Sequence, residues 1–421
     1  LTNKTNLQNL TSVSFQKIHN WLGQKREQIK RYRKDEYQKK AISKILKELK
    51  SKDRTTTIMA CGTGKTLVGL WTYESLRPKI SAVFVPSIGL IKQIRADWLE
   101  QLKFNVKTIS ICSSKDRSSR EDEIQLEQKD LDFEITTDIK KIKNFVNQNT
   151  LEQKIIFCTY QSSLLLGKIF KKKSIDFGIF DEAHRTASLK KFGSKNYTVF
   201  NYALSNKNIN IKKRLFMTAT RRLSSFKKFN KEGDNKEIMT MDNKNIYGKV
   251  CYNLSFLKAA RLGVIAKVKI ITTFITSEEA EYEKRKISRT IIKGKNITTE
   301  QVAYQLAIKN AVRKNNIKKI FSFHSRVYDS DNFTARGPEG ICNHIDNFYT
   351  NHIAGTTKTR KRENIIHKFK TFNKAILSNA RCLVEGVDVP AVEMVAFITP
   401  KQSEIDIVQA IGRALRKRKT N

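Results

Sequence analysis

Short apolar runs alternate with amphipathic segments through the first half of the chain. Runs of the type SAVFV precede polar or glycine-containing residues and, in most cases, a helix-like stretch. They predict strands at residues 81–85, 106–111, 154–158, 177–180 and 214–217. Residues 88–102 place apolar side chains at three- and four-residue spacing, as in a helix packed on a sheet. The alternation predicts stacked strand–helix units around a mostly parallel sheet.

A second series of the same kind follows a polar region near residues 232–249. It contains an amphipathic stretch at 301–313 and apolar runs at 319–323, 375–378 and 394–398. We therefore predict an α/β fold of two halves joined by a polar linker. The predicted ranges are a basic extension (1–32), a first domain (33–240) with a polar insertion at about 113–150, a linker and start of the second half (241–300), and a second domain (301–421).

The charge of the chain indicates a class of binding partner. The chain has 81 Lys and Arg against 40 Asp and Glu, a net charge of +41. Such an excess favours a polyanionic partner, nucleic acid first and an anionic membrane second. A Lys-, Asn- and Ile-rich background from an AT-rich genome is the alternative explanation. However, residues 207–231 contain nine basic residues and no acid, whereas residues 121–138 contain eight acids and one lysine. This segregation favours a functional basic surface.

The cysteines and the apolar runs bear on compartment. Cys61, Cys112, Cys158, Cys251, Cys342 and Cys382 form no CxxC pair and have no His at zinc spacing. We expect free thiols in a reducing compartment and no structural zinc. No apolar run reaches the ~18 residues of a membrane span, and no signal-peptide core is visible. We expect the protein to be located in the cytoplasm or another reducing intracellular compartment and not to be secreted. Since the chain starts at Leu1, we also expect a fragment or trimmed product, whose second domain could be truncated at its C-terminus.

The stretch IMACGTGKTLVG (58–69) holds most of a phosphate-binding loop, with Met59 where the common pattern has its first glycine. Gly62 and Gly64 permit a tight turn around Thr63. Lys65 can reach the β- and γ-phosphates, and Thr66 can ligate Mg²⁺. Backbone amides make the phosphate contacts, so the first position tolerates a side chain.

The stretch FGIFDEAH (177–184) is an apolar strand that ends in two carboxylates. Asp181 suits Mg²⁺, directly or through water, and Glu182 can accept a proton from an attacking water. A capped helix start is the alternative reading of these acids. Near the C-terminus, Arg413 and Arg416 lie on one helix face and can reach a γ-phosphate as arginine fingers. A solvated basic helix is the alternative there.

Taken in order, these segments resemble the core of the superfamily 2 helicases and nucleic-acid translocases. The matching stretches are 37–45 as a Q-like motif, 59–66 (motif I), 85–93 (Ia), 159–163 (Ib), 181–184 (II), 217–220 (III), 321–326 (IV), 378–392 (V) and 409–416 (VI). The sequences DEAHRTAS, RLFMTAT and SNARCLVEGVDVP are similar to the corresponding motifs of predicted helicases of bacteria, phages and large DNA viruses, including the motor modules of type ISP and type III restriction enzymes.

The resemblance implies two tandem RecA-like domains, each a mostly parallel sheet flanked by helices, with an ATP cleft between them. It assigns nucleotide and Mg²⁺ binding to Gln38, Gly62, Thr63, Gly64, Lys65, Thr66, Asp181, Glu182, Gly386, Asp388, Gln409, Arg413 and Arg416. It assigns coupling of hydrolysis to movement to His184, Thr218 and Thr220. It assigns nucleic-acid contact to Pro86, Ser87, Gln93, Thr159, Tyr160, Gln161, Ser325, Arg326, Asn379 and Ala380.

The function implied is that of an ATP-dependent DNA helicase or translocase, such as the motor of a restriction or phage or viral DNA-processing system, with ATP and Mg²⁺ as cofactors. An RNA helicase is the alternative, because the DEAH signature also marks splicing-type RNA helicases. A non-catalytic nucleic-acid-binding protein is a more remote one. No nuclease segment or methyltransferase glycine loop is visible, so we expect any such partner domains outside this chain.

Overall fold

The fold is described from a computed structural model for residues 31–113, 131–187, 199–221, 240–266, 269–290, 297–337, 339–380, 392–399 and 407. Its first half contains α3 (Glu36–Ser51), β1 (Arg54–Met59), α4 (Lys65–Leu76), β2 (Ile80–Val85), α5 (Ile88–Gln101), β3 (Val106–Ile111), β4 (Ile135–Thr136), α6 (Ile139–Asn147), β5 (Gln153–Thr159), α7 (Ser163–Gly167), β6 (Ile175–Phe180), the 3₁₀ turns η2 (Ala183–Thr186) and η3 (Tyr202–Leu204), β7 (Ile211–Thr218), α9 (Lys244–Tyr247), β8 (Lys249–Leu254) and α10 (Phe256–Arg261). Its second half contains α11 (Ser277–Thr290), α12 (Thr299–Asn315), β9 (Lys319–His324), α13 (Val327–Thr334), η4 (Ile341–Asn343), β10 (Tyr349–Ile353), α14 (Thr359–Thr371), β11 (Ala375–Ala380) and β12 (Met394–Phe397).

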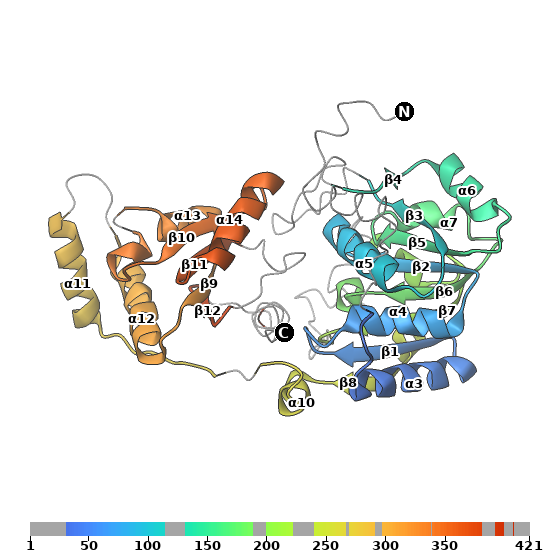
Figure 1. The fold of residues 1–421 in the computed structure, drawn as a ribbon, viewed down its shortest axis with the longest axis horizontal. Coiled ribbons are helices and arrows are strands. Elements are labelled where there is room, and N and C mark those ends of the chain that lie inside the picture. The colour runs from blue at the N-terminus through green and yellow to red at the C-terminus, as the bar shows by residue number, and fades with distance from the viewer. Residues whose placement is uncertain are drawn as a thin grey trace, which may run out of the picture.

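The first half is built on an eight-stranded sheet with the order β4-β3-β5-β2-β6-β7-β1-β8 (Figure 1). Every neighbouring pair of strands is parallel. All the carboxyl ends therefore lie at one edge, where open α/β sheets place their ligands. Each apolar run predicted as a strand in this half lies within one of these strands.

Different helices cover the two faces of this sheet. Along β2, Val83 and Val85 pack on the side of α3, α4 and α5, whereas Ala82 and Phe84 pack on the side of α6, α7 and α9. This alternation is the two-residue period of a strand buried on both faces. The first half is therefore a three-layer structure with the sheet in the middle.

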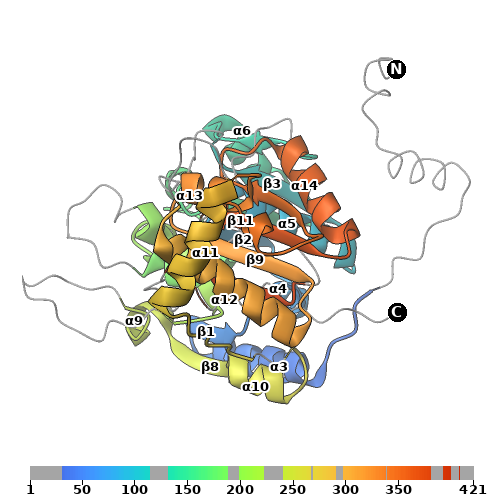
Figure 2. The ribbon, with the colours of Figure 1, turned by 90° about the vertical axis from the view of Figure 1, so that its left-hand side faces the viewer.

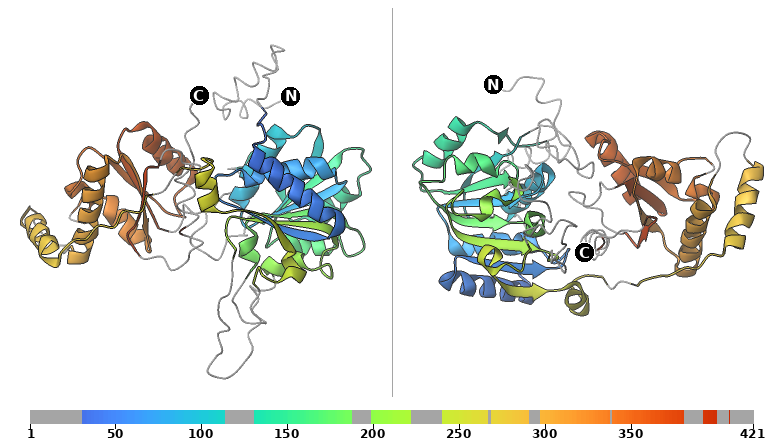
Figure 3. Two further views of the ribbon diagram at one scale, coloured as in Figure 1. Left: turned by 90° about the horizontal axis from the view of Figure 1, so that it is seen from below. Right: turned by 180° about the vertical axis from the view of Figure 1, so that it is seen from behind.

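The second half has its own parallel sheet, with the order β10-β11-β9-β12. Phe321 and Phe323 of β9 pack with Phe369 of α14 on one face, and Ile320 packs with Phe333 of α13 on the other. Figure 3 shows α11 lying against α12 on the side away from this sheet. The predicted α/β fold with two parallel sheets, each flanked by helices, is confirmed.

Two details differ from the predicted ranges. Residues 135–147, expected within a polar insertion, form β4 and α6, and Ile142 and Val146 of α6 are buried in the core. Residues 249–254, expected in the linker, form β8, which pairs with β1 and lies beside α3 (Figure 2). Within the part of the chain that the structure describes, no helix is long and apolar enough to cross a bilayer.

Candidate nucleotide site

The phosphate-binding loop connects β1 to the first turn of α4. Gly62 and Gly64 have φ angles of 79° and 76°, in the left-handed region that glycine adopts without strain. A Cβ atom on Gly64 would lie 2.6 Å from Gln38 Nε2. Met59 is the last residue of β1, and its side chain is fully buried among the α3, α4 and α5 residues. It lies in the strand before the turn, which explains why the loop accepts methionine there.

Gln38 holds this loop from α3. Its Oε1 accepts a hydrogen bond from the Asp35 backbone N–H at 2.9 Å, and its Nε2 donates to the Thr63 carbonyl at 3.2 Å. Tyr37 donates its hydroxyl to the same carbonyl at 3.1 Å. Tyr37 was not among the residues predicted for the site, although its place beside Gln38 in the Q-like motif was a usable signal. Both side chains therefore fix the backbone of the loop. A contact between Gln38 and a nucleotide stays a prediction.

Lys65 and Glu182 form an ion pair, with Nζ 3.1 Å from Oε1. Both side chains are largely buried. Burial alone would lower the pKa of Lys65, but Glu182 and Asp181 together raise it above its ordinary value. Burial alone would raise the pKa of Glu182, but Lys65 and then His184 hold it well below its ordinary value. Lys65 is therefore kept ionised by the two carboxylates at the end of β6, and Glu182 is kept ionised by Lys65 and His184.

The two carboxylates stand where β6 ends and η2 begins. The Asp181 backbone N–H donates to the Phe84 carbonyl at 2.9 Å, which ties this turn to β2. Glu182 has φ 47° and ψ 46°, a left-handed conformation that costs a non-glycine residue roughly 1–2 kcal/mol. A backbone held in such a conformation is common at functional sites. The turn directs Glu182 toward the phosphate-binding loop.

A polar chain leads from Glu182 to the end of β7. His184 Nδ1 lies 3.4 Å from Glu182 Oε2 and 3.0 Å from Thr218 Oγ1. Thr218 donates its hydroxyl to the Thr220 carbonyl at 2.7 Å. The structure thus brings together the three residues predicted to couple hydrolysis to movement, and it links them directly to the predicted general base.

The predicted nucleic-acid contacts lie at the carboxyl edges of both sheets. In the first half, the Tyr160 backbone N–H donates to the Val85 carbonyl at 2.9 Å, so residues 159–161 lie beside Pro86 and Ser87. Gln93 follows on α5. In the second half, Ala380 pairs in register with His324, next to Ser325 and Arg326. The sheets therefore align the predicted contacts of each half along one edge.

Tyr160 requires a correction. Its side chain is fully buried, its ring stacks on Phe180, and its hydroxyl donates to the Asp181 carbonyl at 2.7 Å. The side chain is thus part of the turn that carries the carboxylates and does not reach a nucleic acid. The side chains of Thr159, Asn379 and Ala380 are also buried, so in this structure only their backbone groups are oriented for such contact.

The donor set fits a magnesium nucleotide. Thr66 and Asp181 offer a hydroxyl and a carboxylate, the hard oxygen ligands that Mg²⁺ prefers, and Mg²⁺ keeps several waters at such sites. The left-handed glycines and the start of α4 provide the cradle that binds a phosphate. Gly386, Asp388, Gln409, Arg413 and Arg416 lie outside the described residues.

Two family models match the chain. The model described as the type III restriction enzyme res subunit matches residues 31–223, and that described as the helicase conserved C-terminal domain matches residues 301–418. The chain is 25% identical over 395 residues to a protein named "Probable helicase A859L" of African swine fever virus (strain Badajoz 1971 Vero-adapted). This match covers 90% of the chain and 39% of the viral protein.

Solved structures of restriction enzymes share the fold. The type ISP restriction-modification enzyme LlaBIII, bound to DNA, is similar with a TM-score of 0.78 and 26% identity over 93% of this chain. A nuclease-deletion mutant of the type ISP enzyme LlaGI, in complex with a DNA substrate mimic, has a TM-score of 0.64 and 24% identity over 91% of this chain, a likeness of fold alone. The chain spans 27% and 26% of these two proteins.

Proposed function

We propose that this chain, which belongs to the superfamily 2 helicases, hydrolyses ATP to move along or unwind DNA. A helicase-type role follows from the family. One observation carries the proposal of an active enzyme: Lys65, Asp181 and Glu182 meet at the phosphate-binding loop, and Glu182 is linked through His184 to Thr218. A non-catalytic descendant of the fold would have no need to keep this arrangement.

The Lys65–Glu182 pair has a chemical consequence for catalysis. Phosphate oxygens bound in the loop would attract the ammonium of Lys65 away from Glu182. Glu182 would then lose the strongest of the charges that lower its pKa, while His184 and Arg185 would still act on it, so this carboxylate would accept a proton from water more readily than in its pair with Lys65. Mg²⁺, held by Thr66 and Asp181, would neutralise charge on the β- and γ-phosphates.

The second half completes the site in this proposal. Gln409, Arg413 and Arg416 would approach the γ-phosphate when the two halves close, and Gly386 and Asp388 would respond to the nucleotide. An arginine placed in this way contributes about 10³ to 10⁵ in rate. Hydrolysis would reopen the cleft, so that the two edges that carry Ser87 and Ser325 move relative to each other along the backbone of the nucleic acid.

DNA is the favoured polymer because LlaBIII, 26% identical over 93% of this chain, was solved bound to DNA. The net charge of +41 supports binding to a polyanion. Since the chain spans 27% of LlaBIII, we propose that nuclease or methyltransferase partners act with it from outside these residues.

ATPase assays with no polymer, duplex DNA, single-stranded DNA and RNA test the proposal. We expect DNA to stimulate turnover, and we expect Lys65→Ala and Glu182→Gln to abolish it. Equal ATPase rates with and without every polymer would contradict the proposal of a motor. Stimulation by RNA alone would indicate that the enzyme acts on RNA instead of DNA. A strand-displacement assay then separates unwinding from translocation, because movement alone also consumes ATP.

A further inference from the structure

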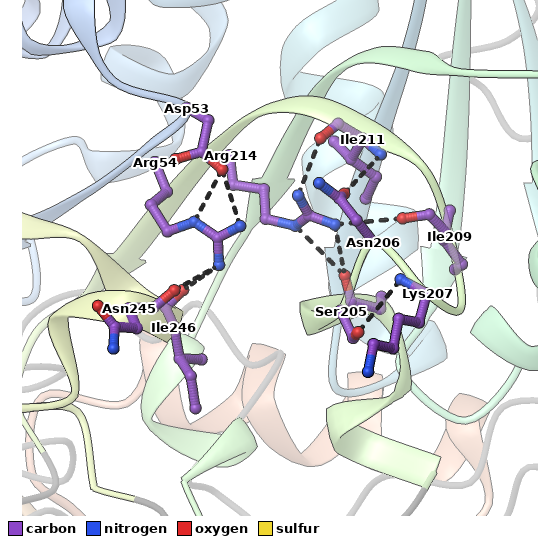
Figure 4. A network of polar contacts seen from close by, with 11 residues as sticks. Asp53, Arg54, Ser205, Asn206, Lys207, Ile209, Ile211, Arg214, Asn245 and Ile246 are labelled. Atoms are coloured by element: carbon purple, nitrogen blue, oxygen red, sulfur yellow. Dashed lines mark hydrogen bonds and ion pairs between the residues drawn. The ribbon is translucent and has the colours of Figure 1, made fainter.

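The segment that leaves the first sheet ends beside the candidate site. It consists of α9 and β8, and the chain continues through α10 toward α11 and α12 (Figure 1). Arg54 anchors α9 by donating from Nη1 to the carbonyls of Asn245 at 2.8 Å and Ile246 at 3.2 Å (Figure 4). Asp53 in turn holds the Arg54 guanidinium through two hydrogen bonds. This segment is therefore fixed to the base of the strand that leads into the phosphate-binding loop.

Tyr247, the last residue of α9, connects this segment to the turn that carries the carboxylates. It is fully buried, and its hydroxyl lies 2.9 Å from Thr186 Oγ1 at the end of η2. Thr186 donates its own proton to the Ala183 carbonyl at 2.7 Å, so Tyr247 is the donor of the shared bond. The Tyr247 carbonyl accepts from Thr56 Oγ1 of β1 at 2.7 Å, and its ring meets Phe216 of β7 edge to face.

These contacts place Tyr247 in a segment that touches both sides of the candidate site. The turn from Asp181 to Thr186 holds Glu182 in a left-handed conformation that its surroundings must maintain. At the other end of the segment, the Leu254 carbonyl of β8 accepts from the Ala60 backbone N–H at 3.0 Å, at the start of the phosphate-binding loop. The segment is therefore in contact with both the loop and the turn before the chain crosses to the second half.

We propose that Tyr247 is a positioning residue that transmits the nucleotide state of the turn to β8 and α10. The inference rests on the proposed nucleotide site. A shift of Glu182 on ATP binding moves η2, and the hydroxyl bond from Tyr247 to Thr186 carries that shift into the segment that leads to the second sheet. The residue acts through the turn and touches no reacting atom.

The test compares Tyr247→Phe with Tyr73→Phe in the 421-residue chain. Tyr73 is an equally buried tyrosine of α4 whose hydroxyl donates one hydrogen bond, to Gln153 at the opposite end of the sheet. Loss of one buried hydroxyl should lower stability similarly in both variants. We expect only Tyr247→Phe to reduce kcat, by about tenfold, with the KM for ATP changed less than about twofold, as for one lost hydrogen bond expressed in turnover.

Hydrogen exchange gives a second readout that needs no turnover. We expect Mg²⁺-ATP to change amide protection of residues 249–261 in the wild type and in Tyr73→Phe, and to leave it unchanged in Tyr247→Phe. In the double variant with Thr186→Val, the loss of kcat should equal that of Thr186→Val alone, because Thr186→Val already removes the bond to Tyr247 together with the bond from Thr186 to the Ala183 carbonyl.

The outcomes separate the two proposals. A wild type that binds ATP but hydrolyses none with any polymer removes the proposed function, and the exchange experiment still decides the role of Tyr247. A wild type whose residues 249–261 do not respond to Mg²⁺-ATP overturns that role. So does a Tyr73→Phe variant that loses kcat as strongly as Tyr247→Phe.

Discussion

At the scale of single residues, the charge states in the site depend on one another. Lys65 and Glu182 are both shielded from water, so each remains ionised because the other is present. Removing one partner of such a pair lowers the free energy of unfolding far more than removing one partner of an exposed pair, because an uncompensated charge is left in a poorly solvated place. Catalysis and stability therefore respond together to changes here.

Lys65→Met should lower the free energy of unfolding at pH 7 by about 3–5 kcal/mol, because it leaves Glu182 buried without its cation. The folded pKa of Glu182 is about 2, against an ordinary 4.5. The stabilisation by the pair is therefore complete above pH 4.5 and is lost as the pH falls toward 2. Urea unfolding measured across this pH range should show that the difference in free energy of unfolding between wild type and variant becomes smaller as the pH falls.

The matched control is Lys39→Met. Lys39 pairs with Glu36 at 2.6 Å, but both side chains are exposed, so water and salt screen the pair. We expect no measurable change in stability. An equal loss in both variants, or a gap that stays constant with pH, contradicts the role given to the buried pair.

Tyr160→Phe tests the corrected place of that residue. The variant deprives the buried Asp181 carbonyl of its donor, which should cost about 1–3 kcal/mol and reduce ATP turnover. Affinity for DNA at fixed salt should change less than about twofold, since a buried ring makes no phosphate contact. Filter binding and ATPase rates check both statements, and a large loss of affinity with unchanged turnover would return Tyr160 to the DNA surface.

At the scale of elements, the strands that appear as apolar runs were predictable, including β12 at a sheet edge, whereas the edge strands β4, β8 and β10 were not. The interior strands β2, β5 and β6 are buried on both faces and appear in the sequence as unbroken apolar runs. The edge strands β8 and β10 are half exposed, so their residues are mixed and produce no such run. Their existence depends on partners far away in the chain.

Buried lysines hold helix ends in both halves. Lys154 of β5 donates to the Val146 carbonyl at the end of α6, and Lys319 of β9 donates to the carbonyls of Phe369 and Phe372 at the end of α14. The last carbonyls of a helix lack partners within it, so a cation there satisfies them and complements the helix dipole. Neither role is visible in a sequence with this many lysines.

Lys319→Met should lower the stability of the second half by about 1–3 kcal/mol, because three carbonyl contacts lose their donor. Mg²⁺-ATP affinity of the first half should be unchanged. Hydrogen exchange of α14 and β9 reports the first effect, and nucleotide titration reports the second. Lys314→Met, at an exposed position in the last turn of α12, is the control and should leave α14 unaffected.

At the scale of the whole molecule, the order of motifs predicted which residues would meet at the sheet edges. Lys65, Asp181, Glu182, His184 and Thr218 come together because parallel strands end at one edge. Tyr247 was not predictable, because a tyrosine that supports a turn looks in sequence like any core aromatic, whereas the place of Tyr37 in the Q-like motif was a usable signal. The cooperation of Arg413 and Arg416 with this edge stays a prediction, since both lie outside the described residues.

Arg416→Ala tests that cooperation. We expect ATP affinity to be retained, because the phosphate-binding loop is intact, and turnover to fall about 10³-fold or more through loss of charge stabilisation in the transition state. Equilibrium binding of a fluorescent ATP analogue and steady-state ATPase rates separate the two. Unchanged turnover rejects the role of Arg416 as an arginine finger.

The position of β1 between β7 and β8 sets a condition on how the chain can be made. The strand that ends in the phosphate-binding loop emerges from the ribosome before both of its neighbours, which begin at Ile211 and Lys249. Until residue 254 has been synthesised, β1 lacks one row of backbone partners and offers an open edge for aggregation. A shorter expression product should therefore extend past Leu254, and one that stops at residue 240 should be recovered mainly as insoluble protein.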